Sequence, residues 1–374
     1  MDKSIFIIHY QPLEYYPPVQ NIIRFLEENQ QDRKVYVFTT KPAVKGITRF
    51  TSGLHRIKII TLGKVQVNQL RIKRFLHYQF FNIRTFLQLC VKRPPKVLYI
   101  ETLSSFPAYL YKKTINPKAD ILIHYHEYTS PAEYRDGMVL AKKFHRYEQY
   151  LYPLAVWVSH TNQDRMQKFL EDIYPVKIKA PHILPNYPPR SWAKYIVPAE
   201  KKDKLMIVYA GALGMETMYL KEFAEWVEEQ EGRVQWHIYS QQDGSELISM
   251  LTSICARNIH FKGNVSYSQL AATLGNYDIG VILYKGHIPN YIFNAPNKLF
   301  EYAACGLDIW FPQQMIGSHA YITTGCFPKI VPLDFDKLKE QITPAVLSHE
   351  GLQYKPSPYF CENILPDLAQ YLNN

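Results

Sequence analysis

The sequence predicts an α/β protein with two doubly wound parallel sheets, and three observations support this fold class. The chain has 374 residues, 47% of them hydrophobic, which is enough for two buried cores. Short runs of β-branched and aromatic residues alternate with polar or helix-like stretches along its whole length. These runs are almost continuously apolar, as is typical of parallel strands covered on both faces.

The expected strands fall into two groups separated by a linker. The first group comprises residues 4–10, 34–40, 56–62, 96–102, 119–128 and 154–160. The second group comprises residues 205–211, 234–240, 258–263, 278–284 and 308–312. A proline-rich stretch at 183–192 and a charged one at 198–204 lie between them and indicate a hinge. We therefore expect an N-terminal domain at 1–190, a C-terminal domain at 191–355, and a helix within 356–374 that could pack back on the N-terminal domain.

The positive charge of the chain is concentrated in its first half. The formal net charge is +10, and the stretch from Lys41 to Lys118 has sixteen Lys or Arg against one acidic residue, Glu101. Within it, residues 69–93 form an amphipathic pattern surrounded by basic side chains. The apolar positions at helical spacing are Ile72, Leu76, Phe80, Ile83, Leu87 and Cys90. Two interpretations stay open: the apolar stripe packs on its own sheet, or it docks on an anionic membrane surface.

Several other classes of protein are not expected. The N-terminal apolar run is too short for a secretory signal, and no segment reaches the roughly 18 apolar residues of a membrane span. This predicts a cytoplasmic protein, with peripheral association at the inner membrane face as an option. The five cysteines are widely spaced and suggest neither a zinc site nor a disulfide framework. No nucleic-acid recognition motif is present, so nucleic acid is not an expected partner.

Residues 294–306, NAPNKLFEYAACG, predict a binding site for a nucleotide. Ligands of open parallel sheets bind beyond the carboxyl ends of the strands, where helix N-termini favour negative charge. A helix starting near Asn297 and ending before Gly306 would place its positive end and Lys298 against a phosphate. Glu301, one turn further on, would accept hydrogen bonds from two vicinal hydroxyls. A phosphate next to a diol describes a nucleotide ribose.

These residues resemble those of GT-B glycosyltransferases, most closely the retaining, group 4-like enzymes that build bacterial surface polysaccharides. Three donor-domain segments carry the resemblance: 295–311, 207–227 and 258–284. In the first half, HYHEYTSP (124–131) is similar to the acceptor-domain motif of the family, and ILPNYPP (183–189) to the entry into its linker. The resemblance covers nearly the whole chain. It implies two Rossmann-like domains that face a cleft, with the nucleotide sugar bound by the second.

The resemblance also implies roles for individual residues. Glu301 would bind the ribose hydroxyls, and Asn297 and Lys298 would lie against the diphosphate. The remaining donor-site residues that it implies are Gly211, Tyr239 and Val265.

On the acceptor side, the resemblance puts His126 and Glu127 near the transferred sugar or the acceptor hydroxyl. His124 belongs to the same strand end. Tyr10 and Glu14 lie in the loop after the first strand. With inversion of configuration, Glu127 would be the general base.

The sequence departs from the family pattern at two places. Phe293 stands where many retaining relatives have the first of two glutamates, and Gly211 is not followed by the usual Arg and Lys. Because a leaving diphosphate must be stabilised, Lys298, Lys285 or the helix dipole would have to replace the missing cations.

The predicted function is transfer of a hexose-type unit from a UDP- or GDP-sugar to a glycan or polyprenyl-diphosphate-linked acceptor in capsule, exopolysaccharide or lipopolysaccharide synthesis. The family mechanism is retaining and needs no enzyme nucleophile, metal or cofactor. Two alternatives remain: a nucleotide-sugar 2-epimerase, and a catalytically silent subunit that binds a partner or the membrane.

Overall fold

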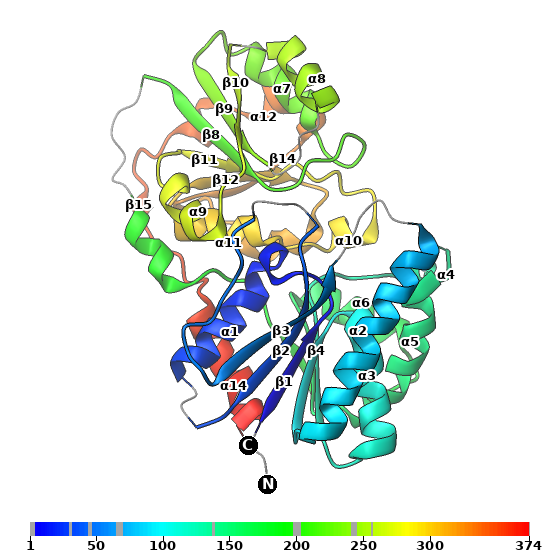
Figure 1. Cartoon of the computed structure of the whole chain (residues 1–374). Coiled ribbons are helices and arrows are strands. Elements are labelled where there is room, and N and C mark those ends of the chain that lie inside the picture. Colours follow the sequence, from blue (N-terminus) through cyan, green and yellow to red (C-terminus); the bar gives the residue numbers. More distant parts are fainter. Residues whose placement is uncertain are drawn as a thin grey trace. The chain divides into compact units, whose positions relative to one another are not determined.

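The computed structural model describes residues 4–29, 32–43, 47–64, 70–136, 139–196, 203–240, 245–255 and 257–373. The chain divides into two compact units (Figure 1). Unit 1 is Met1–Pro185 with Glu362–Asn374, and unit 2 is Asn186–Cys361. Each unit contains a parallel sheet covered by helices, which confirms the predicted fold class.

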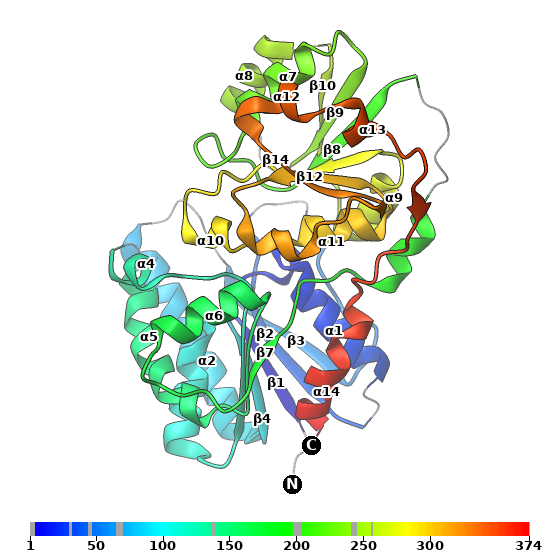
Figure 2. The same ribbon diagram turned by 180° about the vertical axis from the view of Figure 1, so that it is seen from behind.

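Unit 1 is built on a seven-stranded parallel sheet in the order β3-β2-β1-β4-β5-β6-β7. Its strands are β1 (Ile5–His9), β2 (Val35–Lys41), β3 (Ile57–Lys64), β4 (Lys96–Ile100), β5 (Asp120–Tyr125), β6 (Trp157–His160) and β7 (Pro181–Ile183). Helices α1 (Pro17–Asn29) and α14 (Leu365–Asn373) lie on one side of this sheet, and α2 (Arg71–Lys92), α3 (Ser105–Leu110) and α5 (Val139–Leu151) on the other (Figures 1 and 2). The shorter helices are α4 (Pro131–Asp136) and α6 (Gln163–Asp172).

The C-terminal helix α14 is part of unit 1. Its Tyr371 ring lies 5.2 Å from the Trp157 ring of β6, and the Arg33 guanidinium donates a 3.0 Å hydrogen bond to the carbonyl of Leu372. The chain thus leaves unit 1 after Pro185 and returns to it at Glu362.

Unit 2 is built on a six-stranded parallel sheet in the order β10-β9-β8-β11-β12-β14. Its strands are β8 (Leu205–Ala210), β9 (Val234–Tyr239), β10 (Ile259–Gly263), β11 (Ile279–Val281), β12 (Asp308–Pro312) and β14 (Ile330–Leu333), with a separate pair, β13 (Cys326–Phe327) and β15 (Gln353–Tyr354). Its helices are α7 (Leu220–Glu228), α8 (Ser245–Cys255), α9 (Tyr267–Leu274), α10 (Pro289–Ile292), α11 (Asn297–Ala304), α12 (Leu338–Gln341) and α13 (Pro344–Leu347). One hydrophobic cluster packs α7 on the sheet, and a second packs α9 and α11.

Several strand boundaries differ from those that the sequence predicts. Strand β5 ends at Tyr125 because the Glu101 side chain takes the next two backbone N–H groups out of the ladder. Strand β6 starts only at Trp157, after a 3-10 turn that contains Pro153. Strands β7 and β14 were not predicted, since they are only three and four residues long.

Helix α2 buries a different face from the one that the apolar pattern indicates. The predicted stripe positions Ile72, Leu76, Phe80, Ile83 and Leu87 are exposed. Tyr78, Phe81 and Leu89 are buried instead, and Tyr78 and Phe81 pack edge-on against the ring of Tyr10. The interpretation that the stripe packs on its own sheet was therefore wrong. Among the described residues, no helix combines the length and apolar character needed to cross a membrane.

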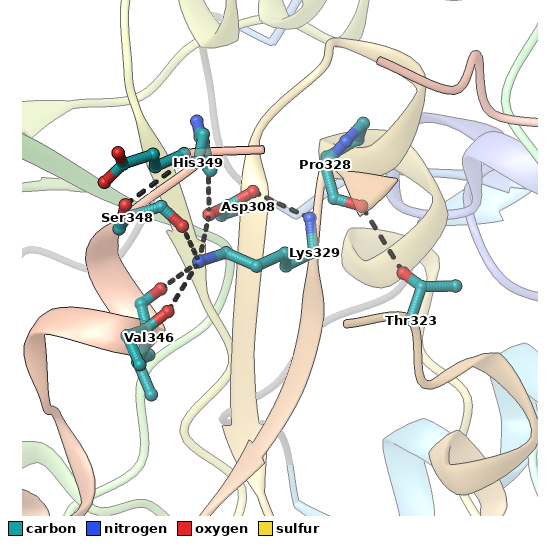
Figure 3. Close-up of polar contacts among 9 residues, drawn as sticks. Asp308, Thr323, Pro328, Lys329, Val346, Ser348 and His349 are labelled. Atoms are coloured by element: carbon teal, nitrogen blue, oxygen red, sulfur yellow. Dashed lines mark hydrogen bonds and ion pairs between the residues drawn. The ribbon is translucent and has the colours of Figure 1, made fainter. Parts of the chain in front are cut away.

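A buried ion cluster fixes the segment 345–349 to the sheet of unit 2 (Figure 3). Lys329 Nζ lies 3.9 Å from Asp308 Oδ2 and also donates to the carbonyls of Val346 and Ser348. The other contacts of Asp308 are its 2.7 Å hydrogen bonds with His349 Nε2 and with the backbone N–H of Lys329. Because Asp308 is the first residue of β12, the cluster lies at the amino ends of the strands. It stabilises the fold and is remote from the edge where parallel sheets bind ligands.

Replacing Lys329 with methionine should destabilise the protein strongly. The side chains of Lys329 and Asp308 are only 4% and 5% exposed, so the variant would leave a buried carboxylate without its cation. We expect a loss of about 3–5 kcal/mol in the free energy of unfolding, measured by urea denaturation. Lys339→Met is the matched control, because Lys339 forms an ion pair with Glu229 but is 69% exposed, and should cost less than about 1 kcal/mol. Equal effects of the two changes would contradict this account.

Candidate functional site

The topology of each sheet locates one candidate site. In unit 2, β8 lies between β9 and β11, and in unit 1, β1 lies between β2 and β4. The strand order reverses at these places, so the loops that follow the paired strands diverge and leave a crevice beyond their carboxyl ends. In unit 2 this crevice is bordered by Gly211, which follows β8, and by the segment from β11 to α11. In unit 1 it is bordered by Tyr10 after β1 and Glu101 after β4.

Lys298 reaches back from α11 to the end of β8. Its Nζ donates a 3.0 Å hydrogen bond to the Tyr284 hydroxyl and lies 5.2 Å from the centre of the Tyr209 ring. A Cβ atom at Gly211 would come within 2.6 Å of Lys298 Nζ, and Gly211 has φ of +148°. The loop that follows β8 at Gly211, which we call the glycine loop, therefore leaves space for the Lys298 ammonium group that a side chain at residue 211 would fill. The structure brings the predicted residues Gly211 and Lys298 together.

Helix α11 begins at Asn297, as the sequence predicts, and its amino end carries the cation and a carboxyl group. Asn297 is half-buried, and the N-cap, Pro296, makes no side-chain capping bond. Glu301 is only 6% exposed. Burial raises the pKa of the Glu301 carboxyl to about 7, and the positive charge of Lys298 opposes this shift. The ionised form of such a buried carboxyl group is unfavourable, and a ligand with hydrogen-bond donors would stabilise it.

The other predicted donor-site residues occupy the same edge of the sheet. Tyr239 is the last residue of β9, and its carbonyl accepts a 2.9 Å bond from the Gly211 N–H. Val265 follows β10 and packs, like Tyr239, against the cluster that includes α11. Lys285, in contrast, forms a 2.9 Å ion pair with Glu222. Of the two lysines considered as substitutes for the missing cations, Lys298 is thus the one directed at the glycine loop.

In unit 1, Glu101 organises the turn that carries the predicted catalytic residues. Its Oε1 accepts hydrogen bonds from the N–H groups of His126 (2.6 Å) and Glu127 (3.1 Å). Glu101 itself has φ of +66°, a strained conformation for a residue with a side chain. Burial, followed by the nearby Glu127 charge, raises the pKa of Glu101 to about 8. His126 is buried by this turn, whereas Glu127 is exposed.

Three histidines of unit 1, His9, His124 and His126, form a buried cluster. His124 Nε2 lies 3.2 Å from His126 Nδ1, and His124 Nδ1 lies 2.9 Å from Ser159 Oγ. The His126 ring is also 6.4 Å from the His9 ring. Burial lowers the pKa of His124 well below its usual value and that of His9 to about 3. Both stay neutral at physiological pH, so they can position groups but supply no positive charge.

Tyr10 and Glu14 are engaged away from these histidines. The Tyr10 ring packs against Tyr78 and Phe81. Glu14 forms a 3.1 Å ion pair with Arg49. The structure gives both residues a packing or positioning role in the first loop and directs neither side chain to His124 or His126.

A pocket of about 260 Å³ opens beside Glu127 within unit 1. Its walls are aromatic, with Tyr125, Tyr128, Tyr134 and Phe169, and its basic groups come from α4 and α5. The basic groups are Arg135, Lys142, His145 and Arg146, against the carboxyl groups of Glu127 and Asp172. The pocket therefore offers aromatic faces and cationic side chains to a ligand.

The sequence did not identify Glu101 or this pocket as functional. Glu101 was visible only as the single acidic residue of the basic stretch, near the end of the expected strand 96–102. The pocket combines residues of the HYHEYTSP segment (124–131), Glu127 among them, with residues of α4, α5, β6 and α6 that share no local motif with that segment. Among the described residues, no group of three His, Cys, Asp or Glu side chains is arranged to hold a metal ion.

Comparison with known proteins shows the fold. No protein-family model and no curated protein matches the sequence. Among solved structures, sucrose-phosphate synthase from Thermosynechococcus elongatus is similar, with a TM-score of 0.67, 15% identity, and coverage of 98% of this chain and 98% of that one. Anabaena HepE in complex with UDP has a TM-score of 0.63 at 10% identity, with 99% of both chains covered. A UDP-N-acetylglucosamine 2-epimerase has a TM-score of 0.57 at 9% identity and covers 98% of this chain and 96% of that one. The chain has the GT-B fold.

Proposed function

We propose that this protein is a glycosyltransferase that takes a sugar from a nucleotide diphosphate sugar, UDP- or GDP-linked. The observation that carries the proposal is the start of α11, where Lys298 lies over the glycine loop and Glu301 is buried with a raised pKa. A bound diphosphate pairs with the Lys298 ammonium group and accepts hydrogen bonds from the amino end of α11. The ribose hydroxyls donate hydrogen bonds to the Glu301 carboxylate. Anabaena HepE, which has the same fold, was solved with UDP.

The proposed acceptor is a lipid-linked glycan of the polyprenyl diphosphate type. The pocket beside Glu127 offers tyrosine rings for a sugar and Arg135, Lys142 and Arg146 for a phosphate. Such an acceptor belongs to capsule, exopolysaccharide or lipopolysaccharide synthesis at the inner face of the membrane. In this proposal the acceptor binds unit 1 and the donor binds unit 2.

The proposed reaction retains configuration and uses neither a metal ion nor another cofactor. The bond between the sugar C1 and the phosphate oxygen breaks, and a bond from C1 to the acceptor oxygen forms on the same face. The leaving phosphate takes the proton of the acceptor hydroxyl. Lys298 and the start of α11 stabilise the diphosphate charge, while the turn held by Glu101 positions His126 and Glu127 at the acceptor.

A thermal-shift titration with UDP, GDP, ADP and CMP tests the proposal. A nucleotide at 100 times its dissociation constant stabilises the folded state by about 2.7 kcal/mol, which corresponds to a rise of about 5 °C in Tm. We expect this rise with UDP or GDP, its loss in Glu301→Ala, and its retention in Glu228→Ala, an exposed carboxylate of α7. The absence of a shift with every nucleotide would contradict the proposal and favour a silent subunit.

A nucleotide-sugar 2-epimerase remains the second candidate, because the fold is shared with UDP-N-acetylglucosamine 2-epimerase. An epimerase would convert the nucleotide sugar without any acceptor. Incubation of the protein with UDP-N-acetylglucosamine alone, followed by product analysis, separates the two: turnover in the absence of acceptor would favour the epimerase.

A further inference from the structure

Helix α2 has one face buried in unit 1 and an apolar face that is exposed. Tyr78, Phe81 and Leu89 are buried in the core of unit 1. A row of seven large apolar side chains faces outward, each between 43% and 74% exposed. These are Leu70, Ile72, Leu76, Phe80, Ile83, Leu87 and Val91, which we call the outer stripe. Seven exposed large apolar side chains along one helix indicate an interaction site.

The charged residues of α2 and of its two flanking positions are all positive. Residues 70–93 contain no Asp or Glu. Lys73 and Arg84 are exposed and, at 100° per residue, fall on the same margin of the outer stripe. The Arg84 guanidinium lies 5.3 Å from the centre of the Phe80 ring, which keeps its charge at the edge of the apolar surface. An apolar stripe with a cationic margin is complementary to a bilayer surface that carries negative headgroups.

We propose that the outer stripe of α2 docks unit 1 on an anionic phospholipid membrane. Helix α2 lies in the plane of the interface, with the outer stripe at the boundary between headgroups and acyl chains and with Lys73 and Arg84 on lipid phosphates. A second copy of the chain is a poorer occupant. Two-fold pairing of α2 would oppose two helices that both lack acidic residues, and their like charges would repel.

This inference rests on the surface of α2 alone and does not require the proposed transferase activity. It deepens that proposal, since a lipid-linked acceptor lies in the same membrane. Vesicle binding needs no nucleotide sugar and no turnover, so failure of one proposal can be told from failure of the other.

The test is co-flotation of the full chain with vesicles of phosphatidylcholine, with or without phosphatidylglycerol. We expect binding to the anionic vesicles that weakens as salt rises from 0.1 M to 1 M, because the Debye length falls from about 10 Å to about 3 Å. Lys73→Gln with Arg84→Gln should weaken partitioning about 25-fold, since each basic residue near the surface contributes about fivefold. Ile83→Glu with Leu87→Glu should weaken it about 100-fold or more.

Leu54→Glu is the matched control, because Leu54 is also an exposed leucine of unit 1 but lies outside α2. It should bind vesicles like the unmodified protein, and all variants should keep its Tm, since the replaced side chains are exposed. Three results would overturn the proposal: no binding to anionic vesicles, equal binding by Ile83→Glu/Leu87→Glu, or a dimer in light scattering that this double change separates. The last result would make the outer stripe an interface between two copies of the chain.

Discussion

Replacing Glu301 with glutamine should stabilise the unliganded protein above pH 7 while weakening nucleotide binding. The pKa of Glu301 rises from 4.5 in the unfolded chain to about 7 in the folded protein. The folded state therefore holds this proton more tightly, and stability falls as pH rises from about 4.5 to about 7, with no further change above that. A shift of this size corresponds to about 3 kcal/mol. Glutamine carries no charge in this range, so Glu301→Gln should be more stable by about this amount at pH 8.

The same substitution should weaken the binding of the nucleotide. A carboxylate accepts hydrogen bonds from both ribose hydroxyls, and bonds to charged groups contribute about 1.5–3 kcal/mol, so the variant should bind the nucleotide about 10- to 100-fold more weakly. Urea denaturation at pH 5 and pH 8, followed by tryptophan fluorescence, measures the stability. The signal reports mainly on unit 2, since Trp157 is the only tryptophan of unit 1. Glu228→Gln, at an exposed site, should change neither quantity. A loss of stability in Glu301→Gln at pH 8 would show that the carboxylate serves the fold and not a ligand.

Most of the fold could be predicted because its strands are buried on both faces. Every residue of β1 and β4 is buried, and each strand is an apolar run with one polar residue at its end, His9 or Lys96. The ends were less predictable, because contacts distant in sequence decide them. Strand β5 stops where Glu101, about 25 residues earlier, takes the N–H groups of His126 and Glu127. No local pattern around residue 125 records that contact.

The candidate site was predictable where it depends on one helix and less so where it depends on several elements. Lys298 and Glu301 lie within one turn of α11, and the local pattern identified both. Tyr10 and Glu14 were chosen by their place after β1, but the sequence does not show that Tyr78 and Arg49 engage them. For α2, the buried face mixes Tyr78, Phe81 and Leu89 with the polar residues Asn82 and Thr85, so the apolar periodicity marked the exposed face instead.

Lys298→Met should reduce turnover more than any other single change at the proposed donor site that keeps the fold. This chain lacks the cations that its resemblance to GT-B glycosyltransferases leads us to expect after Gly211, so in the proposed reaction the leaving diphosphate would depend on Lys298 and the amino end of α11. Loss of one preorganised group that stabilises developing charge typically costs about 10²–10³ in kcat. The affinity for the nucleotide should fall less, because the amino end of α11 and Glu301 still bind the nucleotide in the ground state. Single-turnover kinetics with the nucleotide sugar, compared with equilibrium binding of the nucleotide, separates the two effects.

Lys285→Met is the matched control for Lys298→Met. Both lysines lie near the carboxyl ends of unit 2 strands and approach tyrosine rings. Lys285, however, is paired at 2.9 Å with Glu222, whereas Lys298 Nζ lies on the Tyr284 hydroxyl beside Gly211. We expect less than about a tenfold loss of kcat from Lys285→Met, because its charge is already compensated. A larger loss from Lys285→Met than from Lys298→Met would mean that Lys285 leaves Glu222 when the donor binds, and that Lys285 is the cation that replaces the missing Arg and Lys.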